Sequence, residues 1–449
     1  MTKPLLRRYF VGLLLACLIS TSHAANPILH GFADPAMRVL NDRMYLTVGK
    51  DLSPTRKGFA MPYWAIYSSA DLVYWRQEKI IDPELVSYMG KGTLRCWATD
   101  ITFANGKFFF YFSDGGVSTG VLIADRPDGE YQEVLKKPLV APEKGNLTPY
   151  DPTIFTDTDG SHYLIFGRDG HLANETENRH YQIAKLNPDL VSLAEKPKSL
   201  MTDQKYGFGD ENHATDHSYL HKYKDTYYLS RDQCYMTSKS IYGPYSNLRK
   251  TGQPGHTCFI SYHGQWYHSW EFSDDQFGVR TYRQTMMTYL HYKDNGDMVD
   301  DHFFLEGGKG FAYGVGNYNT DWDRIEAECF FEISGADKRD CPAGGFEIQN
   351  ITNGSYLKYP KVKNLQANCR IFFRVSSANP KGGKILIHQG GPDGPLLGTC
   401  EVPCTQDWDK YQLVSCELKN GAGTADLCLA FEGDGELMHL DWFTFQTPK

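Results

Sequence analysis

"YDPTIFTDTDGSHYLIFG", residues 150–167, contains one complete unit of the pattern that decides the fold. Asp151 comes first, followed by a short apolar run, a turn rich in Asp and Gly, and an aromatic run that ends at Gly167. Two short runs of β-branched and aromatic residues around a glycine turn predict an antiparallel pair of strands.

Four other stretches of the chain have the same order of parts. They are "DPAMRVLNDRMYLTVG" (34–49), "TDITFANGKFFFYFS" (99–113), "DHSYLHKYKDTYYLS" (216–230) and "HTCFISYHGQWYHSW" (256–270). Five such units at a spacing of roughly 40–65 residues predict an all-β fold, a five-bladed β-propeller. A two-sheet sandwich is the alternative.

The starts of these units carry acidic and histidine side chains. In a propeller the innermost strands line one central channel, so equivalent strand starts meet at one end of it. The residues placed there are Asp34, Asp100, Asp151, Asp216 and His256. Crowding raises some carboxyl pKa values and leaves others low, which allows a general acid and a general base to coexist. The pattern therefore predicts acid–base catalysis at the channel mouth.

Length and charge limit the class of protein. A chain of 449 residues is too long for one compact core, and a net charge of −8 argues against a nucleic-acid partner. After about residue 322, alternating strands such as "LMHLDWFTFQ" indicate a second, β-sandwich domain of jelly-roll type. We expect a propeller over 25–320 and a sandwich over 321–449.

The first 24 residues resemble an export signal. Basic residues precede an apolar run that is too short to span a membrane, and small residues follow it. We expect a periplasmic or extracellular protein with no transmembrane segment, lipid-anchored at Cys17 in an alternative interpretation. Seven of the ten other cysteines lie beyond residue 328 and could form up to three disulfides.

The region 26–310 resembles glycoside hydrolase family 43. The resemblance is carried by the stretches quoted above together with "CWATD" (96–100) and "YRQTMMTYLHYKDNGDM" (282–298). It implies a five-bladed propeller that hydrolyses glycosidic bonds with inversion. Inversion needs two carboxyl groups about 6.5–9.5 Å apart, one to activate water and one to protonate the leaving group.

The resemblance also implies roles for single residues. Asp34 would be the general base, and Asp151 would tune the acid and hold the sugar. The acid is usually a Glu three residues before an aromatic residue, but in this sequence Asp216 stands at that position. The alternatives are that Asp216 is the acid, that Glu211 on the preceding loop replaces it, or that catalysis is altered or lost.

Four further propeller residues are implied as substrate contacts. His256 matches a histidine that contacts a metal or water in the channel, and Arg283 matches an arginine that contacts the substrate or the carboxylates. Trp97 and Tyr219 could stack against a sugar ring, although packing between blades is the competing interpretation for both. Through His256, the resemblance also implies a possible ion in the propeller channel.

Residues 322–449 resemble carbohydrate-binding module family 6. The resemblance implies a structural calcium site at Glu326, Glu328 and Asp441, because hard oxygen ligands suit Ca²⁺. In the implied sugar cleft only Trp408 keeps an aromatic residue. A domain that only stiffens the propeller is the alternative to sugar binding.

The sequence thus predicts an exported glycoside hydrolase that acts on a plant polysaccharide or oligosaccharide. We expect an α-L-arabinofuranosidase or β-xylosidase type that removes terminal arabinofuranosyl or xylosyl residues. An exo-β-galactosidase or galactanase of the same family, or a non-catalytic glycan-binding protein, are the alternatives.

Overall fold

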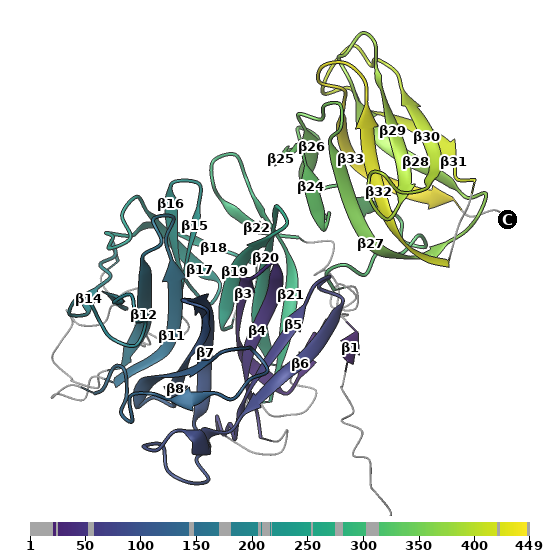
Figure 1. The fold of residues 1–449 in the computed structure, drawn as a ribbon. Coiled ribbons are helices and arrows are strands. Elements are labelled where there is room, and N and C mark those ends of the chain that lie inside the picture. Colours follow the sequence, from purple (N-terminus) through teal and green to yellow (C-terminus); the bar gives the residue numbers. More distant parts are fainter. Residues whose placement is uncertain are drawn as a thin grey trace, which may run out of the picture.

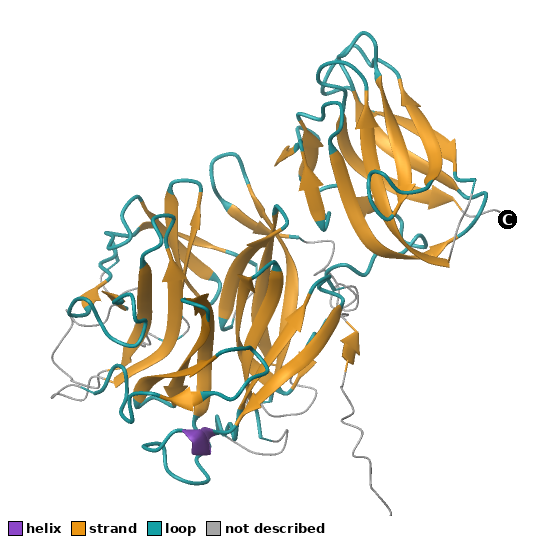
Figure 2. Cartoon of the chain, viewed as in Figure 1, coloured by secondary structure: helices purple, strands orange, loops and turns teal. Residues whose placement is uncertain are grey.

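The computed structural model describes residues 21–23, 26–52, 58–142, 148–169, 181–204, 208, 216, 218–252, 255–273, 282–301, 314–419 and 423–446. Strands dominate these ranges, and the helical structure found in them is one short turn of 3₁₀ helix, η1 (Pro83–Leu85) (Figure 2). The all-β fold class predicted from the sequence is confirmed.

In the described part of the N-terminal region, five antiparallel sheets lie side by side (Figure 1), and their innermost strands contact one another in a closed ring. The first contains β1 (Thr21–His23), β3 (Phe32–Leu40), β4 (Arg43–Lys50), β5 (Trp64–Ser69) and β6 (Tyr74–Ile81). The second contains β7 (Cys96–Ala104), β8 (Lys107–Asp114), β9 (Ser118–Ala124) and β10 (Gln132–Glu133). The third contains β11 (Thr148–Thr156), β12 (His162–Asp169), β13 (Gln182–Lys185) and β14 (Lys198–Ser199).

The last two sheets complete the ring. The fourth contains β15 (Tyr219–Tyr223), β16 (Thr226–Arg231), β17 (Cys234–Ser238) and β18 (Ser246–Lys250). The fifth contains β19 (Thr257–Tyr262), β20 (Gln265–Ser273), β21 (Arg283–Tyr292), β22 (Met298–Asp300) and the early strand β2 (Leu29–His30). Because β2 pairs with β21, the two ends of the propeller are joined by backbone hydrogen bonds. The predicted five-bladed propeller is confirmed.

The aromatic strands of the repeat are buried on both faces because each blade lies between two others. In β8, Phe110 and Phe112 pack with Trp64 of the first blade, whereas Phe109 and Tyr111 point to a cluster shared with the third blade. Alternate side chains of a strand face opposite sides of its sheet. A run of consecutive aromatic residues therefore supplies two inter-blade interfaces at once.

The C-terminal domain is a β-sandwich, as predicted. One sheet contains β25 (Asp337–Asp340), β26 (Phe346–Gln349), β33 (His439–Gln446), β28 (Arg370–Ser376), β31 (Gln412–Glu417) and β23 (Ile325–Glu326). The other contains β24 (Glu332–Ser334), β27 (Tyr356–Leu365), β32 (Gly423–Glu432), β29 (Gly383–Gln389) and β30 (Leu396–Val402). The predicted boundary at 320–321 lies between β22 and β23.

The two domains share a continuous apolar core. Tyr289 of β21 and Tyr318 bond through their hydroxyl groups at 2.7 Å, and Tyr318 donates to the carbonyl of Cys329 at 2.7 Å. Gln265 of β20 donates to the carbonyls of Glu328 and Phe330 at 2.7 and 3.1 Å. The sandwich is therefore docked on the fifth blade by buried contacts.

The predictions about export fall mostly outside the described residues, since residues 1–20, including Cys17, are not among them. No helix in the described ranges is long and apolar enough to cross a membrane. The ten cysteines after Cys17 all have free thiols in the structure, so the disulfides considered from the sequence are not formed in it.

Candidate active site

Two β-bulges aim the predicted carboxylates Asp34 and Asp151. Each aspartate has a positive φ, 54° and 50°, and each is followed by proline. The register of β3 against β4 and of β11 against β12 shifts at these residues. A left-handed aspartate before proline is a strained backbone, and such strain is typical of functional sites. Each bulge turns the aspartate side chain away from the regular strand pairing of its blade.

The second blade carries a different residue at the equivalent place. The register of β7 against β8 shifts between Cys96 and Thr99, so Trp97 takes the position of the bulge aspartates. The prediction that Asp100 belongs to the ring at the channel mouth is therefore wrong. Asp100 lies three residues further along, where the first and third blades have Met37 and Ile154.

Asp100 is instead part of an ionic plug inside the channel. Its Oδ2 accepts a hydrogen bond from Arg38 at 2.5 Å and one from the backbone N–H of Ile154 at 2.9 Å. Arg38 also donates to the carbonyl of Ile154 at 2.7 Å and to the hydroxyl of Tyr219. One guanidinium thus joins four blades, and Asp100 is its counterion.

Asp34 is held by a second buried arginine, Arg283. The Nη1 of Arg283 donates to Asp34 Oδ1 at 2.7 Å and to Glu271 Oε2 at 3.0 Å. Its Nε and Nη2 donate to the two oxygens of Asp51 at 3.2 and 2.9 Å. The Nδ1 of His256 lies 3.7 Å from Asp34 Oδ1. The structure therefore brings Asp34, Arg283 and His256 together, as the sequence predicts.

Asp34 and Glu271 share the positive charge of Arg283, and this affects the pKa of Asp34. Burial raises its pKa, Arg283 lowers it, and the neighbouring carboxylates Glu271 and Asp151 raise it again, so that the pKa lies well above the ordinary value. Glu271 also accepts a hydrogen bond from the backbone N–H of Asp34 at 3.2 Å. Sequence reasoning missed Glu271 and Asp51, because neither stands at a repeated position.

Asp151 lies close enough to Asp34 to affect its titration. Its backbone N–H donates to Ser113 Oγ at 2.6 Å, which fixes the bulge against the second blade. The hydroxyl of Ser218, two residues after Asp216, lies 3.5 Å from the carbonyl of Asp151. The third and fourth blades are therefore joined just below the carboxyl groups.

Asp216 is the more accessible of the two predicted acid–base partners. Its side chain is 33% exposed, against 7% for Asp34, and its Oδ1 lies 3.6 Å from Nε of Arg231. Its carbonyl accepts a hydrogen bond from Tyr181 at 2.5 Å. Glu211, the alternative acid, and the neighbouring histidines His213 and His217 lie outside the described residues.

The two aromatic candidates differ in position. Trp97 is half-buried, donates from Nε1 to the carbonyl of Phe59 at 3.0 Å, and packs edge-on against the exposed Phe59 ring. Phe59 in turn covers the guanidinium of Arg283 at 5.0 Å. Tyr219 is 2% exposed and belongs to the channel plug. Its placement fits the packing interpretation and does not support a sugar platform.

The comparisons with known proteins agree with this geometry. The model of "Glycosyl hydrolases family 43" matches residues 24–298. The chain belongs to this family. A second model, "Carbohydrate binding module (family 6)", matches residues 326–447, the sandwich domain.

Curated relatives of this family 43 chain match it over more than nine-tenths of its length. An "Arabinoxylan arabinofuranohydrolase" of Bacillus subtilis (strain 168) is 27% identical, with 97% of this chain and 98% of that protein covered. A protein of the same name from Paenibacillus polymyxa is 26% identical, covering 93% of this chain and 73% of that protein. A crystal structure of a family 43 arabinoxylan arabinofuranohydrolase from Bacillus subtilis, in complex with cellotetraose, aligns with a TM-score of 0.53 at 23% identity. It covers 94% of this chain and 97% of that one, which supports the fold.

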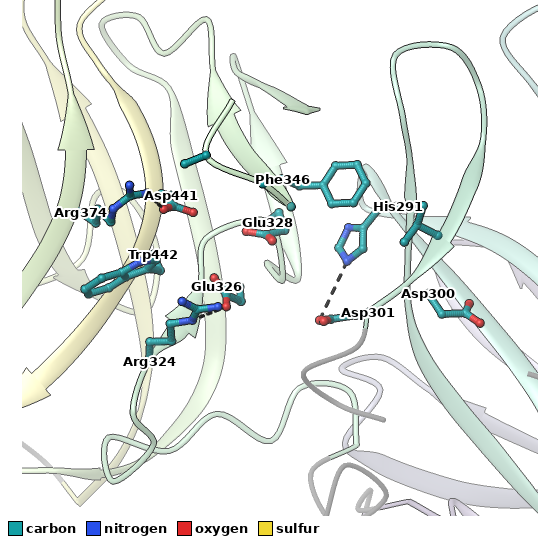
Figure 3. A pocket seen from close by; sticks show the side chains of 14 residues that line it. His291, Asp300, Asp301, Arg324, Glu326, Glu328, Phe346, Arg374, Asp441 and Trp442 are labelled. Atoms are coloured by element: carbon teal, nitrogen blue, oxygen red, sulfur yellow. Dashed lines mark hydrogen bonds and ion pairs between the residues drawn. The ribbon is translucent and has the colours of Figure 1, made fainter. Parts of the chain in front are cut away.

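The family 6 module gathers the three predicted metal ligands at one cavity of about 720 Å³. Glu326, Glu328 and Asp441 line it together with Asp301 of the propeller (Figure 3). Burial and the neighbouring carboxylates raise the pKa of Glu326, against the opposing effect of Arg324, to about 7. Burial and the same neighbours raise the pKa of Glu328 well above its ordinary value. Mutual repulsion of this kind is relieved by a bound cation.

The predicted sugar contact of the module, Trp408, lies between β30 and β31. Its ring stacks on His439 at 4.7 Å with an interplanar angle of 18°. Beneath this pair, Glu347 accepts a hydrogen bond from Tyr411 at 2.6 Å, and its other oxygen lies 3.3 Å from His439 Nδ1. The half-buried Trp408 ring is thus supported by His439, which Glu347 and Tyr411 hold in place. The sequence did not indicate Glu347.

Replacing Glu271 with Gln is predicted to change the pH dependence of catalysis. Loss of the negative charge beside Asp34 lowers the pKa of Asp34, so this predicted base stays ionised to lower pH. The acidic limb of the kcat/KM profile should move to lower pH by about one pH unit. Glu271→Asp, which keeps the charge, is the control. A uniform loss of activity with an unmoved limb would show that Glu271 has only a structural role.

Proposed function

We propose that this chain is an inverting family 43 glycosidase that removes terminal arabinofuranosyl residues from arabinoxylan-type polysaccharides, with terminal xylosyl residues as the second substrate. The observation that carries the proposal is the bulge-held pair Asp34 and Asp151 with Asp34 clamped by Arg283. The names of the Bacillus subtilis and Paenibacillus polymyxa relatives, both "Arabinoxylan arabinofuranohydrolase", support the choice of sugar. A "Xylosidase/arabinosidase" of Bacteroides ovatus, 25% identical over 52% of this chain, supports the second substrate.

The residues supply the parts of a single displacement. Asp34, held by Arg283, accepts a proton from a water molecule, and the oxygen of this water attacks the anomeric carbon. Asp216, on the fourth blade and open to solvent, donates a proton to the leaving oxygen. Asp151, on the third blade, binds the sugar, while its charge favours the protonated form of a neighbouring acid. Phe59 and Trp97 form the apolar wall beside Arg283.

Asp34→Asn tests the proposed base. The amide keeps the shape and can still accept the hydrogen bond from Arg283, but it cannot take a proton. We expect turnover of arabinoxylan oligosaccharides to fall by at least about 10³-fold, while calorimetric binding of the same oligosaccharides is retained. Asp159→Asn, at an exposed turn of the third blade, is the matched control. Unchanged turnover in Asp34→Asn would contradict the assignment, and binding without turnover in the native protein would favour a glycan-binding protein.

Asp216→Asn and Glu211→Gln distinguish the two possible acids. Aryl leaving groups need little protonation, whereas sugar leaving groups need much. The variant that lacks the acid should therefore lose oligosaccharide hydrolysis and keep much of its aryl-arabinofuranoside hydrolysis. We expect this behaviour of Asp216→Asn. If Glu211→Gln behaves so instead, the acid lies on the preceding loop.

We also propose that the module binds a calcium ion through Glu326, Glu328 and Asp441. The donor set fits, because all three groups are carboxylates that line one cavity and Oε2 of Glu328 is buried without a hydrogen-bond partner among the described residues. Arg324 and Arg374 neutralise Glu326 and Asp441, and no such cation pairs with Glu328 in the described part of the chain. The ion would hold β23 against β33.

We further propose that the protein acts outside the cytoplasm, because residues 1–24 resemble an export signal.

Calcium removal should destabilise the protein more at high pH than at low pH. Since the folded-state pKa of Glu326 is about 7, the calcium-free protein binds protons there at pH 5 and loses this stabilisation as pH rises through 7. The increase in Tm caused by calcium should therefore be larger at pH 8 than at pH 5 in scanning calorimetry. Glu328→Gln should reduce the increase. An equal effect of calcium at both pH values would contradict the proposed ligands.

A further inference from the structure

Three different metal-binding side chains meet at the junction of propeller and module. His291 lies on β21, Asp301 follows β22 directly, and Cys329 follows β23 in the module. Their ligand atoms all lie within 4.8 Å of one another. Sγ of Cys329 donates to Oδ2 of Asp301 at 2.7 Å, and Nε2 of His291 is 3.9 Å from the same oxygen.

The surroundings hold these three groups in place. The His291 ring stacks on Phe346 at 4.7 Å, and Nζ of Lys338 lies 3.0 Å from its Nδ1, so that Nε2 faces Asp301 (Figure 3). The backbone N–H of Asp301 donates to the carbonyl of Tyr289 at 3.1 Å. All three side chains are at least nine-tenths buried. Neither the propeller fold nor the glycosidase chemistry needs this arrangement.

The cluster is open on one side. His291 and Asp301 line the cavity of about 720 Å³ on which the proposed calcium ligands also lie (Figure 3). This cavity gives a water molecule access to an ion held by the three side chains, while Glu328 remains a ligand of calcium.

We propose that His291, Asp301 and Cys329 bind a zinc-type divalent cation, with a water molecule as the fourth ligand. Imidazole nitrogen, thiolate sulfur and carboxylate oxygen are the donors that Zn²⁺ prefers in four-coordinate sites. This donor set differs from the all-oxygen set proposed for calcium. The ion would tie β21 and β22 of the propeller to the start of the module. The proposal does not depend on the enzymatic activity.

Binding would replace protons. The thiol of Cys329 loses its proton as the metal–sulfur bond forms, and Nε2 of His291 must also be free of a proton to bind the ion, so the displaced protons pass to the buffer. Metal uptake should therefore release protons and weaken at low pH. Because the ligands come from both domains, the loaded protein should also unfold at higher temperature.

The test uses the full chain without an affinity tag, saturated with calcium so that the oxygen site is filled. Zn²⁺ is titrated against a chromophoric chelator, and Co²⁺ is used as the spectroscopic probe. We expect one zinc ion per chain and a sulfur-to-cobalt charge-transfer band. Cys329→Ser should lose the band and at least about 100-fold in zinc affinity, since even outer-shell changes cost about 10–100-fold. Cys341→Ser, at another buried cysteine of the module, is the control and should keep both.

The outcomes separate clearly. No zinc binding to the calcium-saturated native protein, or a cobalt complex without the charge-transfer band, would overturn the proposal. Equal zinc affinity in the native protein and in Cys329→Ser would also overturn it. If Cys329→Ser does not fold, the band in the native protein and its loss in Asp301→Asn and His291→Gln decide the question.

Discussion

A single buried guanidinium, that of Arg283, is the interaction on which the active site depends. It extends from the fifth blade to Asp34 and Asp51 of the first blade and to Glu271 of its own blade, so it binds three carboxylates at once. Removing one partner of a buried ion cluster leaves an uncompensated charge, which typically costs about 3–5 kcal/mol. The same contact therefore closes the ring beside the β2–β21 pairing and sets the charge of the proposed base.

A second arginine performs the corresponding task inside the channel. Arg38 joins four blades through Asp100, Ile154 and Tyr219. Asp100 and Ile154 each lie three residues after the bulge residue of their blade. The channel is thus filled by a satisfied ionic plug below the site. The strained aspartates at 34 and 151 can persist because the structure beneath them is rigid.

Much of this architecture could be predicted from the sequence because it is repeated. The alternation of short apolar and aromatic runs predicted the propeller, and the change of pattern after about residue 322 predicted the sandwich. Asp34 and Asp151 were found because each stands at the start of a repeated unit. Asp100 was placed wrongly because the second blade has alanine, not proline, after its bulge residue, Trp97. The bulge is a property of strand pairing and leaves no mark in those letters.

The residues that the sequence did not indicate share one feature: their roles depend on contacts between distant segments. Glu271 lies near the end of β20 and Asp51 directly follows β4, and both join the candidate site only because Arg283 reaches them. The junction cluster is of the same kind, since His291 and Cys329 are brought together by domain docking. Nothing in local spacing predicts such meetings.

The most direct test of the central claim is the stereochemistry of the reaction, followed by ¹H NMR of the sugar released at the first time points. If Asp34 activates water while a separate acid protonates the leaving group, the first product has the anomeric configuration opposite to that of the substrate. A product with retained configuration would mean that a carboxylate attacks the sugar directly, and it would contradict the role of the Arg283-bound Asp34 as a general base.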